Sequence, residues 1–155
     1  MEKINSLTGM TDLIETKADE NVLANKVFQT EKILKEIFTN YAMSEIRTPA
    51  LENTNLFKRS VGDTSDIVNK ELYTFSDKND KSITLRPEGT ASVMRSIIEK
   101  KLDGETHKLW YLGPMWRYER PQKGRYRQFN QAGIEILGYP EGASEFEMIS
   151  IICEL

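Results

Sequence analysis

Cysteine and histidine are almost absent from this sequence. Among its 155 residues there is one of each, Cys153 and His107. A single cysteine excludes an internal disulfide framework, and the two residues together cannot build a zinc site. We therefore predict a chain that has no metal centre of its own.

Long apolar runs and targeting segments are missing as well. No run approaches the roughly 20 apolar residues that a membrane span needs. The N-terminus reads as neither a signal peptide nor a transit peptide, so we expect a cytoplasmic protein without membrane contacts. The formal net charge of −3 and a pI near 5.4 argue against broad, non-specific nucleic-acid binding. The length suits one domain with a real core.

The stretch 108–138 is the most informative part of the chain. It predicts two strands, 108–119 and 128–138, joined by a basic loop. Side chains alternate between the faces of a strand. One face of the second strand is then almost wholly apolar and should pack on a core: Asn130, Ala132, Ile134 and Ile136. The other face is typical of the floor of a small-molecule site, with a gap at the glycine: Phe129, Gln131, Gly133, Glu135 and Leu137.

The loop between these strands concentrates positive charge. Together with the end of the first strand it carries Arg117, Arg120, Lys123, Arg125 and Arg127. Arginine forks suit phosphate oxygens, which they bind in bidentate fashion. The alternative is a hairpin with a solvated basic tip. The polar face of the return strand favours a phosphate site.

The rest of the chain predicts an α+β fold, an antiparallel sheet flanked by helices. A capping box at 16–19 precedes an amphipathic helix over 18–40, and a strand carrying Pro49 follows at 44–51. Residues 53–69 show no clear period. A hairpin is predicted over 71–85, with a five-residue loop.

Two more helices complete this prediction. One spans 88–102, with an apolar stripe at Met94, Ile97, Ile98 and Leu102. Glu88 and Thr90 stand where the preceding strand turns into it, and helix capping alone would explain Thr90 and part of Glu88. The last helix begins at Ser144, and its expected buried side is Phe146, Ile149, Ile152 and either Cys153 or Ile151.

Residues 113–131 closely resemble motif 2 of a class II aminoacyl-tRNA synthetase, specifically of the histidyl-tRNA synthetase family. The helix, strand and proline of 18–50 are similar to motif 1, which forms the dimer interface in that class. Residues 84–90 match the family's loop that holds the amino group of histidine. The resemblance runs from the segment 7–12 to the final helix, so residues 1–155 correspond to the N-terminal portion of a catalytic core. Motif 3 and the anticodon-binding domain are absent from it.

The resemblance implies a role for each matching residue. Arg117 would be catalytic, holding the α-phosphate of ATP and contacting histidine. Glu119 would contact adenine, Phe129 would stack on it, and Arg125 would reach the outer phosphates. Histidine would be bound by Glu88, Gly89, Thr90, Arg117, Gln131 and Glu135, the last accepting a hydrogen bond from the imidazole. Mg²⁺ would accompany ATP, tRNA(His) would be the acceptor, and the intact protein would be a homodimer.

This sequence departs from the family pattern at a few positions. The family usually has Arg where this chain has Thr8, and different residues at Trp116, Tyr118 and Asn130. The last three should alter packing rather than chemistry, because they alternate away from the site. Without motif 3, we expect these 155 residues to be catalytically incompetent alone.

Two other functions stay open at this point. The histidine-sensing regulatory subunit of ATP phosphoribosyltransferase is similar in fold but has lost the phosphate-binding pattern of motif 2. Arg117, Glu119 and Arg125, all present here, argue against it. An RNA-binding module using the loop cations and Tyr126 is the third alternative, and the acidic remainder of the chain argues against that.

Overall fold

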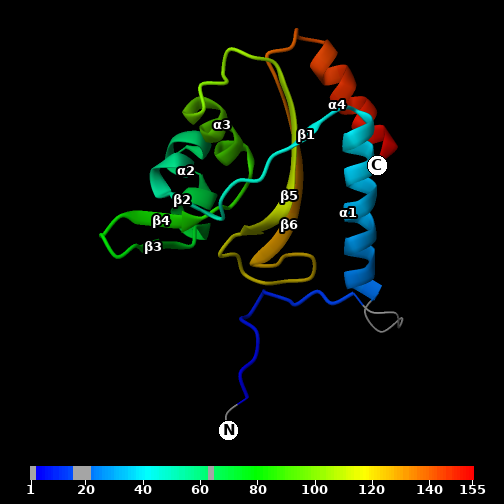
Figure 1. The fold of residues 1–155 in the computed structure, drawn as a ribbon. Helices are drawn as coiled ribbons and strands as arrows, with labels where there is room; N and C mark the ends of the chain where they lie inside the picture. The colour runs from blue at the N-terminus through cyan, green and yellow to red at the C-terminus, as the bar shows by residue number, and fades with distance from the viewer. Residues whose placement is uncertain (1–2, 16–21, 63–64) are drawn as a thin grey trace. The chain divides into compact units, whose positions relative to one another are not determined.

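A computed structural model of the chain describes residues 3–15, 22–62 and 65–155 (Figure 1). These residues form two compact units, each assembled from three stretches of the chain. The first unit takes residues from 1–11, 47–102 and 113–131, and the second from 12–46, 103–112 and 132–155. The capping box predicted at 16–19 lies outside the described residues.

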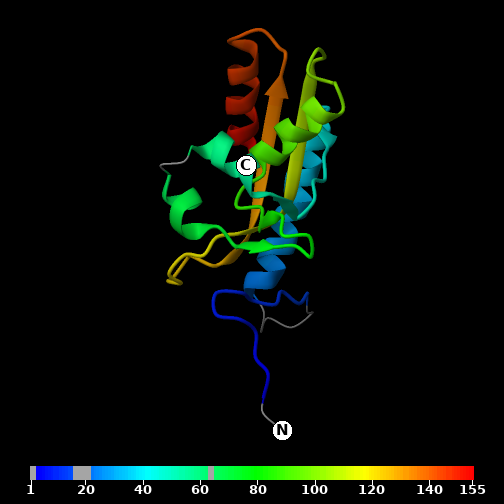
Figure 2. The same cartoon turned by 90° about the vertical axis from the view of Figure 1, so that its left-hand side faces the viewer.

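The second unit contains the helices α1 (Val22–Asn40) and α4 (Ala143–Glu154) and the short strand β1 (Ser44–Glu45). The strands β5 (His107–Trp116) and β6 (Gln128–Leu137) contribute residues to both units. The sheet order is β1-β5-β6, and β5 and β6 run side by side in opposite directions, as the hairpin prediction requires (Figure 2). One pair departs from the predicted antiparallel sheet, because β1 runs parallel to β5.

The core of the second unit joins α1, β5 and α4. Ile37 and Phe38 of α1 pack with Trp110 of β5 and Ile151 of α4, and the Phe38 and Trp110 ring centroids are 5.3 Å apart. Ile134 and Ile136 of β6 pack against this cluster. The predicted apolar side of the return strand is confirmed at these two isoleucines.

The buried side predicted for α4 is wrong at most positions. Phe146, Ile149, Ile152 and Cys153 are exposed, and Ile151 is the buried residue of the helix. The helix contacts α1 and is held by ion pairing of Lys108 with Glu147, 2.6 Å apart, and by a hydrogen bond from the Tyr41 hydroxyl to Glu154. These contacts orient the side of α4 that carries Ile151, rather than its more apolar side, toward the core.

The first unit contains a second small sheet, ordered β2-β4-β3 and antiparallel throughout. Its strands are β2 (Leu51–Asn53), β3 (Thr74–Ser76) and β4 (Ser82–Leu85). The predicted hairpin is confirmed, and its loop closes on Asp77, whose carboxylate accepts from the N–H groups of Asn79 and Lys81. Those bonds, led by that of Lys81, lower the pKa of Asp77. The strand predicted at 44–51 is instead two strands in different sheets, β1 and β2, and Pro49 lies between them.

Two helical segments occupy the region that showed no period. They are α2 (Thr54–Val61) and a π-helix over Ile67–Glu71. The side chain of Asn53 caps α2 by accepting a hydrogen bond from the N–H of Asn55, at 2.9 Å. An eight-residue helix has barely two turns, so its apolar period is too short to stand out from the sequence.

The helix α3 (Thr90–Glu99) is shorter than predicted, and its buried face is different. Ile97 is buried as expected, but Met94 and Ile98 are exposed. The buried side holds mainly small residues, Ala91, Ser92, Val93 and Ser96. The helix also contacts α2, and the exposed Met94 and Ile98 line an open pocket between the two helices. Among the described residues no helix is long and apolar enough to cross a membrane.

The packing of α4 predicts that substitutions of two adjacent isoleucines affect the stability of the fold very differently. Ile151 is 1% exposed and Ile152 is 63% exposed. Ile151→Ala should lower the free energy of unfolding by about 2–5 kcal/mol, the usual effect of a cavity in a core. Ile152→Ala, the matched control, should change it by less than about 0.5 kcal/mol. Urea denaturation followed by circular dichroism measures both, and equal effects would contradict the orientation of α4.

Candidate functional site

The base of the basic loop is pinned on both sides. Beyond the end of β5, the N–H of Arg117 donates to the carbonyl of Arg127 at 3.0 Å, and the N–H of Tyr118 donates to the carbonyl of Glu71 at 2.7 Å. Arg127 stacks over the Tyr118 ring, 4.1 Å from its centroid. These contacts continue the hairpin into the loop, so the residues that follow β5 start from a fixed position.

The side chain of Arg117 is anchored at the end of β5. Its Nε donates to the carbonyl oxygen of Pro87 at 3.0 Å, and its guanidinium lies 5.2 Å from the centroid of the Phe129 ring. Pro87 immediately precedes Glu88. The structure therefore brings together the residue before Glu88, the end of β5 and the start of β6.

Glu119 and Arg125 form an ion pair at 3.3 Å. The Arg125 side chain is 63% exposed, so the pair is weak and the guanidinium is accessible to another anion. The same Glu119 oxygen, Oε2, is buried and makes no hydrogen bond among the described residues, because the approach of Arg125 satisfies a distance but not a bonding geometry. Gln131 Oε1 is likewise buried and makes no hydrogen bond among the described residues.

These two buried acceptors matter because such atoms are rare in native proteins. Each can accept a hydrogen bond from an N–H group of a bound molecule. Both an adenine amino group and an amino-acid ammonium supply such donors. The pattern fits the adenine contact predicted for Glu119 and the α-amino contact predicted for Gln131.

Glu88 caps α3 in the structure. Its carboxylate accepts from the backbone N–H of Thr90 at 2.6 Å and of Ala91 at 3.0 Å. The capping alternative raised by the sequence is therefore present for Glu88, whereas Thr90 acts only through its backbone in these bonds. A carboxylate has about four lone-pair positions, so capping leaves Glu88 able to accept from a ligand as well.

The gap predicted at Gly133 is filled. A side-chain carbon added there would collide with the ring of Tyr111 on β5. The glycine thus lets the Tyr111 ring cross the face of β6, and that face has no empty floor at this position. Glu135, two residues on, belongs to the second unit, and its contact with an imidazole stays a prediction.

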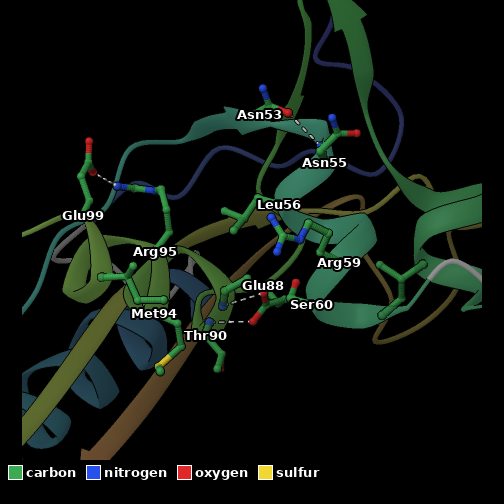
Figure 3. A pocket seen from close by; sticks show the side chains of 13 residues that line it. Asn53, Asn55, Leu56, Arg59, Ser60, Glu88, Thr90, Met94, Arg95 and Glu99 are labelled. Carbon is green, nitrogen blue, oxygen red and sulfur yellow. Dashed lines mark hydrogen bonds and ion pairs between the residues drawn. The ribbon is translucent and has the colours of Figure 1, made fainter. Parts of the chain in front are cut away.

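A separate open pocket lies between α2 and α3 (Figure 3). Glu88 and Thr90 line it with residues that belong to the stretch resembling the family but were assigned no role, among them Asn55, Leu56 and Arg59. Arg95 stands at its edge, paired with Glu52 at 2.6 Å and Glu99 at 2.7 Å. The hydrogen bond with Glu52 raises the pKa of Arg95. No period in 53–69 pointed to this wall, so it could not be predicted.

The N-terminal segment also reaches the basic loop. The carbonyl of Gly9 accepts from the N–H of Arg127 at 2.7 Å and of Gln128 at 3.1 Å. Gly9 has a φ of +81°, and a side-chain carbon there would lie 3.0 Å from Cγ of Arg127. Residues near the chain start thus close the base of the loop.

Gly9→Ala should destabilise this contact. A non-glycine residue in the left-handed region costs about 1–2 kcal/mol, and the tight approach to Arg127 adds to it. We expect the midpoint of urea denaturation to fall accordingly. Gly104→Ala is the matched control, because nothing lies within 4 Å of its added carbon and its φ is not positive. An unchanged midpoint for Gly9→Ala would show that the segment 7–10 does not hold the loop.

The fold is the one that the resemblance to class II aminoacyl-tRNA synthetases implies. Solved histidyl-tRNA synthetases are similar to this chain. The apo enzyme of S. aureus has a TM-score of 0.76 and 40% identity over 97% of this chain and 33% of its own. A Bacillus halodurans C structure, an ATP phosphoribosyltransferase regulatory subunit/histidyl-tRNA synthetase, also has a TM-score of 0.76, over 96% of this chain and 36% of its own. Because the two sequences are only 22% identical, this similarity shows a shared fold and nothing about function.

The chain belongs to the histidyl-tRNA synthetase family, whose sequence model matches residues 20–155. The histidine–tRNA ligase of Desulfitobacterium hafniense (strain DSM 10664 / DCB-2) is 55% identical over 127 residues, which are 81% of this chain and 30% of that protein. The ligase of Legionella pneumophila (strain Lens) is 49% identical over 97% of this chain and 34% of its own length. The chain thus spans about a third of the length of these curated relatives.

Proposed function

We propose that the protein containing this chain is a histidine–tRNA ligase. It activates histidine with ATP to histidyl-adenylate and transfers the histidyl group to tRNA(His). The observation that carries the proposal is the position of Arg117, bound to Pro87 O beside Phe129, with the buried acceptors Glu119 Oε2 and Gln131 Oε1 on neighbouring segments. Family membership supports it.

The first step needs positioning and fixed charge. A carboxylate oxygen of histidine attacks the α-phosphorus of ATP, a new P–O bond forms, and pyrophosphate leaves with the electrons of the broken bond. No proton is transferred, so no general base is required. Arg117 binds the α-phosphate and the histidine carboxylate and stabilises the charge that develops between them.

ATP is bound mainly by motif 2 residues. Phe129 stacks on the adenine ring, and Glu119 accepts a hydrogen bond from its amino group. Arg125 exchanges its weak, exposed pairing with Glu119 for the outer phosphates. Mg²⁺ would accompany the nucleotide, bound chiefly by the phosphate oxygens, and would neutralise part of their charge.

Histidine is bound through its two ends. Glu88, Gly89, Thr90 and Gln131 hold the α-amino group, close to Arg117. Glu135 accepts a hydrogen bond from the imidazole. In the intact protein the segment 18–50 forms a homodimer interface. Pro49, exposed between β1 and β2, is available for such a contact. The protein acts in the cytoplasm.

The decisive test is histidine-dependent ATP–pyrophosphate exchange. We expect a chimera in which residues 1–155 replace the matching region of the D. hafniense ligase to be active, and the 155 residues alone to be inactive.

Arg117→Met should lower the kcat of the chimera by on the order of 10²–10³, the usual effect of removing a charge-stabilising donor. An inactive but folded chimera that binds histidine and not ATP would favour a histidine sensor. Steeply salt-dependent RNA binding without exchange would favour an RNA-binding module.

Replacing Glu135 should weaken the binding of histidine selectively. In the chimera, Glu135→Ala should raise the KM for histidine by roughly 10-fold or more, because it removes a charge-assisted hydrogen bond, while the KM for ATP changes little. Glu141→Ala, an exposed carboxylate after β6, is the control and should leave both values unchanged. Equal losses for histidine and ATP would point to a structural role for Glu135.

A further inference from the structure

Arg86 lies between the end of β4 and the start of α3, one residue before Pro87. Its guanidinium donates from Nε to the carbonyl of Pro114 at 3.1 Å, and from Nη1 to the carbonyl and the hydroxyl of Thr48 at 2.7 and 2.9 Å. One half-buried side chain thus spans two segments that are far apart in sequence. Nothing in the roles already assigned uses it.

The neighbouring residues make room for this side chain. Gly113 lies against it, and a side-chain carbon built on that glycine would stand 3.0 Å from Arg86 Nη2. Such a contact is tighter than ordinary van der Waals packing. The absence of a side chain at Gly113, the first residue of the motif 2 stretch, therefore leaves room for the guanidinium of Arg86 to reach β5.

The backbone of Arg86 is fixed by the same two segments. Its N–H donates to the carbonyl of Ala50 at 2.9 Å, and its carbonyl accepts from the N–H of Trp116 at 3.1 Å. Side chain and backbone together place Arg86 between the segment 48–50 and β5. The next carbonyl along the chain, that of Pro87, then has little freedom.

That carbonyl is the acceptor for Arg117 Nε. We propose that Arg86 is a positioning residue for the adenylation step, which holds Pro87 O and Trp116 so that the guanidinium of Arg117 is aimed at the α-phosphate. This inference rests on the proposed function for what Arg117 does, but the arrangement itself rests on hydrogen bonds within one unit. A misplacement of about 1 Å in a reacting group lowers the rate by on the order of 100-fold.

Lysine cannot replace Arg86 in this role. The guanidinium is a planar fork whose donors point in different directions, whereas an ammonium is a compact point charge on a flexible stem. Lysine would keep the charge and reach Thr48 or Pro114, but it would not bridge them. Arg86→Lys therefore separates positioning from charge, and Arg86→Met removes both.

The first measurement uses the 155-residue chain and does not depend on activity. We expect the Nε–H proton of Arg117, followed by ¹⁵N nuclear magnetic resonance, to exchange with solvent about tenfold faster in Arg86→Lys while far-ultraviolet circular dichroism stays unchanged. Lys58→Met, an exposed cation on α2, is the control and should leave the exchange rate unaltered. Thr48→Val removes one acceptor, keeps the carbonyl, and should give a smaller acceleration. It serves as the test if the Arg86 variants do not fold.

The second measurement uses the chimera described above. Arg86→Lys should lower kcat for ATP–pyrophosphate exchange by on the order of 100-fold while changing the KM for histidine much less. An unchanged Arg117 exchange rate, or an unchanged kcat in an active chimera, would overturn the inference. A chimera that is inactive before any substitution would instead count against the proposed function, and the exchange measurement on Arg117 would still decide the role of Arg86.

Discussion

One hydrogen bond organises the candidate site, the bond from Arg117 Nε to the carbonyl of Pro87. It joins the end of β5 to the turn that starts α3, and these two segments carry most of the residues assigned to substrate binding. The donor is ionised, so the bond is stronger than one between neutral groups. The guanidinium also lies 5.2 Å from the centroid of the Phe129 ring.

Most of the residues proposed to bind substrate stand in one continuous stretch, where sequence patterns are easiest to recognise. Alternation along β6 correctly placed Ile134 and Ile136 against the core, and a cluster of cations in an acidic chain marked the loop. The loop contacts that hold Arg117 were not predictable. They involve Pro87, Glu71 and Gly9, and backbone bonds between distant segments leave no pattern in a single sequence.

The errors in the fold share a physical cause. For α4 and α3, the apolar stripe named the most hydrophobic side, but the buried side was decided by available contacts: Ile151 for α4 and small residues for α3. Burial follows from how closely two elements can approach, and hydrophobicity alone does not contain that information. The same limit applies to Gly133, because the space beside this glycine is filled by the ring of Tyr111, which comes from another strand.

The division into two units has a consequence for how the chain folds. Each unit is made of three separated stretches, so the chain passes repeatedly from one to the other, twice within strands, in β5 and in β6. Neither unit can be cut out as a continuous peptide. The hydrogen bond from the N–H of Arg127 to the carbonyl of Gly9, which closes the base of the loop, joins residues far apart in the sequence. Contacts of such long sequence separation slow folding. On a ribosome, the base of the basic loop would be completed only after most of these residues had emerged.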